Sequence, residues 1–262
     1  MKNLFEDPKN KDSLTGSPRE REPAVKITVL GGQGKFGAAL IERLKQMTGN
    51  LDITTTTDKN RNEELASKAE IVIITVQPNK VEGVLKEIKS SLKDDASVVS
   101  FAFQYPLDSM SEITGKPAAR GMADPWWNVS AVFSETGFPE KDLQRIFNGL
   151  TKMPTIKLES DKDIDKFTIA ISYMLVALLM KRLGTLPNTE KHLEFIAALV
   201  GANVKDMDSF IPPGNPSEAL TLICTKGGAS ESVLKALQSE PNIEPQDLFE
   251  HISKMFIQNK YE

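Results

Sequence analysis

Three glycines near the start of the chain have the spacing of a phosphate-binding turn. Gly32, Gly34 and Gly37 lie within the segment Gly31-Gly-Gln-Gly-Lys-Phe-Gly37. In such a turn the first glycine permits a tight bend, the second lets the backbone approach a pyrophosphate, and the third lets a helix pack closely on a strand. The following helix offers N–H groups and the positive end of its dipole to the phosphates. The pattern predicts a dinucleotide site, with a glycine turn that binds no nucleotide as the alternative. We assign to this site Gly32, Gln33, Gly34, Lys35, Phe36 and Gly37.

The segments on either side of the turn have the patterns of a strand and a helix. In Lys26–Leu30 the four residues after the lysine are β-branched or apolar, as in a buried strand. In residues 38–47 the helical spacing is carried by Ala38, Ile41, Leu44 and Lys45. A strand, a glycine turn and a helix in this order are typical of the first unit of a Rossmann-type domain.

Charged residues follow the second predicted strand, residues 51–57, which is rich in β-branched side chains. In a dinucleotide fold, an acid at this place bonds the ribose 2′-hydroxyl of NAD, and a base accepts the 2′-phosphate of NADP. The sequence has both, with Asp58 on one side and Lys59 and Arg61 on the other. Two cations and several hydroxyls favour NADP, NAD stays possible, and a solvated turn is the alternative without a ligand.

Strands and helices continue to alternate up to about residue 160. We expect strands at 69–76, 96–103, 118–122, 129–133 and 155–158, and helices at 79–92 and 141–150. The turn Val76-Gln77-Pro78 ends a continuous apolar strand at the usual ligand edge of a parallel sheet, so we include these three residues in the cofactor site. From Asp161, a candidate N-cap, we expect helices alone. They are predicted at 161–183, 189–200, 217–224, 230–238 and 245–258.

The predicted fold is therefore α/β, with a Rossmann-type dinucleotide-binding domain at residues 24–160 and an all-helical dimerisation domain at 161–262. Residues 1–23 are polar and proline-containing, and we expect a flexible arm. The stretch Ile169–Leu179 is apolar nearly all round and must be buried on all sides. Because a single thin helical layer cannot bury it, we predict a homodimer with intertwined helical domains.

The composition argues against several other classes. Hydrophobic residues make up 40% and charged residues 26% of the chain, as in soluble globular proteins. The net charge of −4 without a basic stripe argues against nucleic acid. The longest apolar stretch, Ile169–Met180, is too short to cross a bilayer, and the N-terminus lacks the apolar core of a signal peptide. A single cysteine, Cys224, fits a reducing cytoplasm, and no cluster has metal-ligand spacing.

The order of motifs after residue 24 resembles the pyrroline-5-carboxylate reductases. The glycine turn looks like that family's cofactor loop, and Val76-Gln77-Pro78 stands where it has valine-lysine-proline. The segment 119–124 stands where the family has arginine-x-methionine-proline-asparagine. Thr225-Lys-Gly-Gly-Ala-Ser230 looks like its serine-proline-glycine-glycine-threonine-threonine turn, and it is the most specific match because it lies in the helical half.

The chain also departs from these motifs. Lys226 replaces the proline of the last motif and Ser230 its final threonine, while Ala123 and Asp124 replace proline and asparagine. A serine-glycine-serine-glycine-proline-alanine run expected near residue 172 here reads Ser172-Tyr-Met-Leu-Val-Ala177. These departures leave the exact substrate open.

The resemblance implies an enzyme that reduces the C=N bond of a cyclic imine carboxylate with NAD(P)H, as in the last step to proline. It implies that Gly227, Gly228 and Ser230 bind this small-molecule substrate, with Ser230 in the catalytic role, and that Met122 and Asp124 lie near the nicotinamide. Backbone N–H groups at the start of the Ser230 helix form an anion site without any family knowledge. A plain loop with Ser230 as N-cap is the alternative. Lys226 either contacts the substrate carboxylate or faces solvent.

Two other functions stay open. Prephenate dehydrogenases share a similar glycine loop and a helical second domain, but they use a histidine of the nucleotide domain as a base. The two histidines of this chain, His192 and His251, both lie in the helical half. A non-catalytic relative could keep the dinucleotide site and the dimer interface and serve as a sensor or partner.

Overall fold

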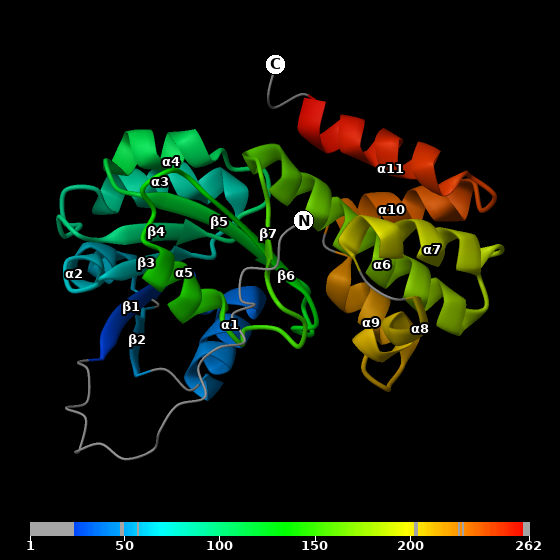
Figure 1. The fold of residues 1–262 in the computed structure, drawn as a ribbon, viewed down its shortest axis with the longest axis horizontal. Helices are drawn as coiled ribbons and strands as arrows, with labels where there is room; N and C mark the ends of the chain where they lie inside the picture. Colours follow the sequence, from blue (N-terminus) through cyan, green and yellow to red (C-terminus); the bar gives the residue numbers. More distant parts are fainter. Residues whose placement is uncertain are drawn as a thin grey trace, which may run out of the picture. The chain divides into compact units, whose positions relative to one another are not determined.

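The structure is a computed structural model that describes residues 24–47, 50–56, 58–201, 204–224, 226 and 228–258. These residues form two compact units (Figure 1). The first contains the described residues up to Gly121 together with Val129–Asp161. The second contains Met122–Asn128 and the described residues after Asp161. The arm predicted at residues 1–23 lies outside the described residues.

The described part of the first unit contains a seven-stranded sheet. Its strands are β1 Val25–Leu30, β2 Leu51–Thr55, β3 Ile71–Ile74, β4 Ser97–Ser100, β5 Ala118–Ala123, β6 Ser130–Ser134 and β7 Ile156–Lys157. The spatial order is β2-β1-β3-β4-β5-β6-β7, and the pairs from β2 to β5 are parallel. Because the order reverses at β1, the glycine turn lies where open α/β sheets bind their ligands. The predicted Rossmann-type fold is confirmed.

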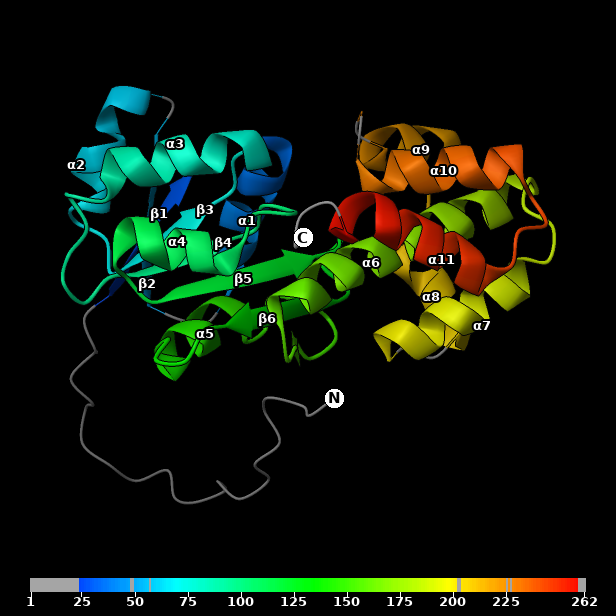
Figure 2. The same cartoon turned by 90° about the horizontal axis from the view of Figure 1, so that it is seen from above.

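Helices cover both faces of this sheet (Figure 2). Helices α2 Asn62–Ala66, α3 Pro78–Ile88 and α4 Leu107–Thr114 pack side by side on one face, with the short turn η1 Lys59–Arg61 before α2. Helices α1 Lys35–Gln46 and α5 Glu140–Phe147 lie on the other face. Arg43 of α1 fixes this layer by donating from Nε to the carbonyl of Leu150, just after α5, at 2.7 Å. The helices α2 and α4 were not among the predicted elements.

The buried face of α1 differs from the predicted one. It consists of Gly37, Leu40, Ile41 and Leu44. Ala38 and Lys45, which the spacing placed with the apolar residues, are exposed. The helix begins three residues earlier than expected. Gly37 packs closely against the glycine turn, so the buried face of α1 runs through Gly37 and Leu40 and not through Ala38.

The second unit is helical throughout its described secondary structure. Its elements are α6 Asp161–Leu183, α7 Thr189–Val200, α8 Val204–Met207, η2 Asp208–Phe210, α9 Pro216–Ile223, α10 Ala229–Ser239, α11 Pro245–Ser253 and η3 Lys254–Gln258. The helix predicted at 245–258 changes to a π-helical turn at Lys254. No helix in the described residues is long and apolar enough to cross a bilayer.

The long helix α6 corrects the reasoning behind the predicted homodimer. Every residue from Tyr173 to Met180 is already buried within a single chain. This helix therefore does not require a second copy to cover it. Exposed apolar surface lies instead on α9, which has no buried residue, and where Leu222 is 48% exposed.

Asp161 was predicted as the N-cap of the long helix, but it lies within the helix and makes contacts with other elements. It is the first residue of α6, and its Oδ1 accepts a 2.6 Å ion pair from Arg120 of β5. Its Oδ2 accepts a hydrogen bond from the Leu107 backbone N–H at 3.1 Å, at the start of α4. Arg120 is fully buried, so this pair fixes the start of α6 and the start of α4 beside the middle of β5.

Candidate functional site

The glycine turn is tightly closed between β1 and α1. Gly31 has a positive φ of 91°, a conformation in which residues with a side chain are strained. The Gly34 backbone N–H donates to the Gly31 carbonyl at 2.9 Å, and Gly34 is the N-cap of α1 in an extended conformation. No side chain caps α1, and its first turn has no acidic residue. This helix end is electrostatically suited to an anion.

The three glycines of the motif meet different surroundings. A Cβ on Gly37 would lie 2.5 Å from the Gly31 carbonyl oxygen and 2.8 Å from the Gly32 Cα. A Cβ on Gly32 would lie 2.3 Å from Thr55 Oγ1. A Cβ on Gly34 would meet only the Gly31 oxygen, at 3.3 Å. Packing therefore requires glycine at positions 32 and 37. At Gly34 the space beside the backbone is open, so a phosphate group can approach there.

A cavity of about 550 Å³ opens beside this turn. Its walls come from the glycine turn, the end of β2, the start of α2, the end of β3 and one side of α3. The lining residues are Leu30, Gly31, Gln33, Gly34, Thr56, Asn62, Val76, Lys80, Gly83, Val84 and Glu87. A cavity with mixed apolar and polar walls at the switch point is what a dinucleotide needs, and the open Gly34 position fits a pyrophosphate.

The structure brings only some of the predicted cofactor residues to this cavity. Gln33, Gly34 and Val76 line it. Lys35 is exposed on the first turn of α1. Phe36 packs its ring 5.3 Å from that of Phe101. Gln77 is the N-cap of α3 and Pro78 its first residue; both are exposed and lie outside the cavity lining.

Four polar lining residues were not predicted: Thr56, Asn62, Lys80 and Glu87. Asn62 is buried and donates from Nδ2 to Glu87 Oε2 at 3.3 Å. Lys80, Gly83, Val84 and Glu87 are spaced as one face of a helix. Because α3 itself was predicted, this spacing would have shown from the sequence that these four residues share one side of the helix.

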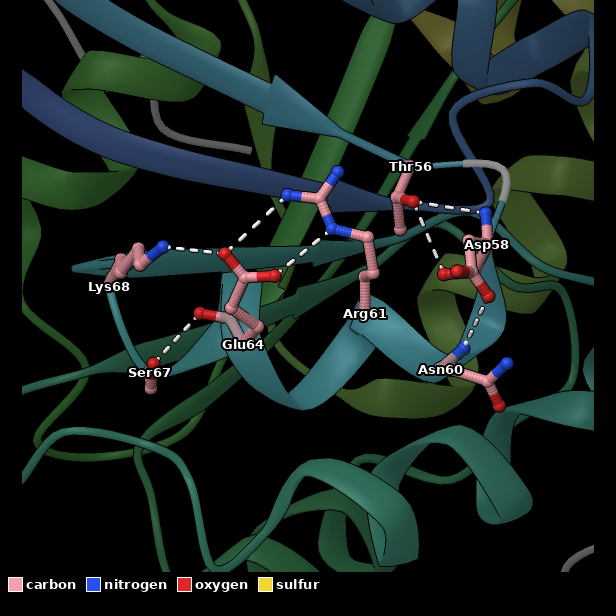
Figure 3. A network of polar contacts seen from close by, with 7 residues as sticks. All are labelled: Thr56, Asp58, Asn60, Arg61, Glu64, Ser67 and Lys68. Carbon is pink, nitrogen blue, oxygen red and sulfur yellow. Dashed lines mark hydrogen bonds and ion pairs between the residues drawn. The ribbon is translucent and has the colours of Figure 1, made fainter.

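The charged residues after β2 are engaged with one another (Figure 3). Arg61 donates from Nε to Glu64 Oε2 at 3.0 Å, and Lys68 pairs with Glu64 Oε1 at 2.7 Å. The hydrogen bonds from Arg61 and then Lys68 lower the pKa of Glu64 to about 2. Asp58 Oδ1 accepts from the Asn60 backbone N–H at 3.0 Å, which fixes the turn η1. Asp58 and Arg61 are exposed, and neither lines the cavity; the side chain of Lys59 lies outside the described part of the chain.

The segment Met122–Asn128 belongs to the helical unit and is held by Asp124. Asp124 is fully buried; its Oδ1 accepts from the Trp126 N–H at 2.9 Å and its Oδ2 from the Asn128 N–H at 2.5 Å. Asn128 Nδ2 in turn donates to the Phe210 carbonyl at 2.7 Å. Trp127 has a positive φ of 59°. The Asp124 carboxylate thus shapes its own loop, and a role for Asp124 or Met122 at the nicotinamide stays a prediction.

Trp126 faces a second cavity, of about 380 Å³, within the helical unit. The proline-rich loop 211–216, α6 and α9 supply the other walls. Arg182 on this wall already donates to three backbone carbonyls, those of Asp208, Ile211 and Pro212, at 2.7 to 2.8 Å. The polar groups of this cavity are therefore largely used by the protein.

The predicted substrate turn precedes α10. Gly228 is the N-cap of α10 in an extended conformation, and no side chain caps the helix. Ser230 is half-buried in the first turn and Lys226 is exposed, whereas Gly227 lies outside the described residues. Glu231 also stands in the first turn, where an acid weakens the attraction for an anion.

The two histidines have unequal surroundings. His192 is 1% exposed, and its Nδ1 shares a short hydrogen bond with the hydroxyl of the fully buried Tyr173. Burial lowers the pKa of His192 and raises that of Tyr173. His251 is exposed on α11. No group of three or more His, Cys, Asp or Glu side chains within the described ranges could hold a metal ion.

The sheet order, the glycine turn at the switch point and the helical second unit together define a Rossmann-type dinucleotide-binding fold with a helical extension. Three solved pyrroline-5-carboxylate reductases share this fold. That from Plasmodium falciparum, solved with NADP bound, is 16% identical, with 88% of this chain and 96% of the other covered and a TM-score of 0.54. That from Coxiella burnetii is 16% identical, covering 89% and 96%, with a TM-score of 0.55.

The third such reductase, from Streptococcus pyogenes, is 19% identical, with 90% of this chain and 99% of the other covered and a TM-score of 0.55. The resemblance noted from the motifs is thus confirmed at the level of the fold. The family described as "NADP oxidoreductase coenzyme F420-dependent" matches residues 49–104, which begin after the glycine turn. No curated protein matches the sequence.

Proposed function

We propose that this chain is an NAD(P)-dependent oxidoreductase that reduces the C=N bond of a cyclic imine carboxylate, as in the formation of proline from pyrroline-5-carboxylate. The observation that carries the proposal is the glycine turn at the switch point, which opens on a cavity of about 550 Å³ through the one motif glycine that packing does not require. The shared fold with three such reductases supports it. NADP is the proposed cofactor, in line with the family that matches residues 49–104.

Each part of the chain has a defined task in this proposal. The backbone around Gly34 and the uncapped start of α1 bind the pyrophosphate. A bound nicotinamide supplies the hydride. The backbone of Gly227 and Gly228 and the uncapped start of α10 bind the substrate carboxylate, with Lys226 as a further positive charge. The Ser230 hydroxyl holds the imine nitrogen and donates a hydrogen bond as that nitrogen gains electrons. An iminium carbon is already electrophilic, so little further acid–base machinery is needed.

The test starts with binding and ends with turnover. The purified chain is titrated with NADPH and with NADH while nicotinamide fluorescence is followed, and pyrroline-5-carboxylate is then added to the tighter complex. Binding followed by oxidation of the nicotinamide is the expected result. Absence of binding to either nucleotide would overturn the proposal.

Binding without oxidation would favour the alternative of a non-catalytic relative that acts as a sensor or partner. The position of Glu231 in the first turn of α10 supports this alternative, because its negative charge weakens the attraction of this helix start for a carboxylate.

We also propose a homodimer formed through the helical unit, in the cytoplasm. The exposed apolar side chains of α9, above all Leu222, support the dimer, and the single Cys224 fits a reducing compartment. Light scattering at micromolar protein should give the mass of a dimer, and Leu222→Glu should shift it toward a monomer. A monomeric wild-type chain at this concentration would contradict the dimer.

A further inference from the structure

The cavity beside the glycine turn has one lysine among its lining residues. Lys80 is the third residue of α3, is exposed, and lines the same cavity as Gly34 and Thr56. Throughout the described ranges, no hydrogen-bond or ion-pair partner exists for its Nζ atom. Thr56 directly follows β2, the strand whose end lies beside the adenosine ribose in this fold. An unpaired ammonium group therefore lines the same cavity as the residue that follows β2.

Of the two cations expected there from the sequence, Arg61 is ion-paired, and the side chain of Lys59 lies outside the described part of the chain. Arg61 is absent from the cavity lining and is bound to Glu64 (Figure 3). Hydrogen bonds from Arg61 and Lys68 lower the pKa of Glu64, so its carboxylate is charged at neutral pH and attracts Arg61. A phosphate that binds Arg61 must compete with Glu64, whereas one that binds Lys80 displaces only water.

The remaining charges around the cavity agree with an anion near Lys80. Neither α1 nor α3 has an acidic residue in its first turn, so both helix starts contribute positive potential beside the cavity that Gly34 and Lys80 line. The lining acid is Glu87, which lies seven residues further along α3, or roughly 10 Å at the rise of an α-helix. Glu87 accepts a hydrogen bond from Asn62, so one oxygen of its carboxylate already has a partner other than Lys80.

We propose that Lys80, on α3, determines the choice between NADP and NAD at this site by binding the ribose 2′-phosphate. The inference rests on the proposed function, namely that a dinucleotide binds at the glycine turn. A 2′-phosphate carries up to two negative charges beside this ammonium group, whereas the 2′-hydroxyl of NAD offers none. Lys80 should therefore strengthen the binding of NADPH and leave that of NADH nearly unchanged.

The test compares dissociation constants of NADPH and NADH for full-length variants at one fixed ionic strength. Lys80→Met should raise the Kd of NADPH by about tenfold, because one charge-assisted contact is lost, and should leave that of NADH within about twofold. Lys80→Arg should restore most of the preference. The matched control is Lys86→Met on the same helix, whose ammonium pairs with Glu82 at 2.5 Å and lies outside the cavity lining. It should leave both constants unchanged.

The other outcomes each overturn the assignment in a distinct way. Equal weakening of NADPH and NADH by Lys80→Met would place the ammonium on the pyrophosphate, which both nucleotides share. A selective loss of NADPH in Arg61→Met, with Lys80→Met unaffected, would return the role to the residues after β2. Failure of the wild-type chain to bind either nucleotide would instead overturn the proposed function, and this assignment would fall with it.

Discussion

Helices α1 and α10 begin alike, and both starts were predicted to bind an anion. Gly34 and Gly228 are N-caps with extended backbones, at φ −65° and ψ 157° and at φ −86° and ψ 168°, and neither helix has a side-chain cap. Their surroundings differ. The start of α1 stands among the ends of three strands and opens on a cavity of about 550 Å³. None of the cavities described above is lined by Gly228 or Ser230.

The first turns also differ in charge. That of α1 has no acid, whereas that of α10 contains Glu231. A glycine before a helix therefore leaves backbone N–H donors free, while neighbouring elements and charges decide how strongly an anion is held there.

The largest effect should come from the glycines of α1. Gly37→Ala should abolish NADPH binding and lower stability by about 1–3 kcal/mol, because its Cβ would meet backbone atoms at 2.5 and 2.8 Å. Gly34→Ala should weaken NADPH binding by about 100-fold, or ~2.7 kcal/mol. Its stability should change by less than about 1 kcal/mol, because the added Cβ meets only the Gly31 oxygen at 3.3 Å.

Thermal unfolding and fluorescence titration measure the two properties separately. If Gly34→Ala binds NADPH as tightly as the wild type, the open space at Gly34 is not where the ligand binds, and the start of α1 has no advantage over that of α10.

The next effect concerns α10. Ser230→Ala should lower kcat/KM for the imine substrate by about 100-fold, as for the loss of one preorganised donor, and leave the Kd of NADPH unchanged. Ser239→Ala is the control, because its exposed hydroxyl bonds the Ala236 carbonyl at the far end of the same helix. Equal activity of Ser230→Ala and wild type would remove the start of α10 from the reaction.

A third effect is on the stability of the helical unit that contains α10. Tyr173→Phe should destabilise the chain by about 1–3 kcal/mol, because it leaves the buried Nδ1 of His192 without its hydrogen-bond partner. Tyr105→Phe is the control, since Tyr105 is only partly buried and packs against the core of the first unit. Denaturant titration compares the two, and an equal loss for both would refute the special role of the buried pair.

The same pair predicts a dependence on pH. Burial lowers the pKa of His192 in the folded chain, so below about pH 6.5 the unfolded chain binds a proton that the folded chain does not. Stability should therefore fall as the pH drops through this value toward the folded pKa. His192→Gln should reduce this slope in denaturant titrations between about pH 7 and about pH 5, on either side of the ordinary histidine pKa. An unchanged slope would assign the effect to other groups.

The smallest effect should come from a substitution that makes the first turn of α10 free of acids, as the first turn of α1 is. Glu231→Gln removes the acid from the first turn and should lower the KM of the imine carboxylate by about two- to fivefold. Glu240→Gln makes the same change at the other end of the helix, where Glu240 is the C-cap, and should not lower KM. If both variants behave alike, net charge and not position is responsible.

Much of the fold was predictable because it rests on local patterns. The apolar runs of β1 and β3 and the glycines between β1 and α1 indicate a parallel sheet with a nucleotide turn. The walls of the cavity were harder to predict, because Lys80 and Glu87 look like a solvated helix face until the strand ends are placed beside them. The ion pair of Arg61 with Glu64 has the i,i+3 spacing of neighbours on a helix, so it was predictable from the sequence.

Other features depend on partners far along the chain. Asp124 resembles a ligand residue by its place in a motif, yet the loop it organises is completed by Phe210, 82 residues beyond Asn128. Arg120 and Asp161 are 41 residues apart, and no periodicity links them. Such contacts follow from the assembled fold and not from any window of sequence.

The passage of Met122–Asn128 into the helical unit has a consequence for dissecting the protein. The backbone crosses between the two units after Gly121, again after Asn128 and again after Asp161. No single cut therefore yields two complete pieces: a fragment ending at Asp161 would carry the tryptophan loop away from the Phe210 carbonyl that secures it. During synthesis this loop leaves the ribosome long before its anchor, and it can reach its final form only when the second half of the chain has followed.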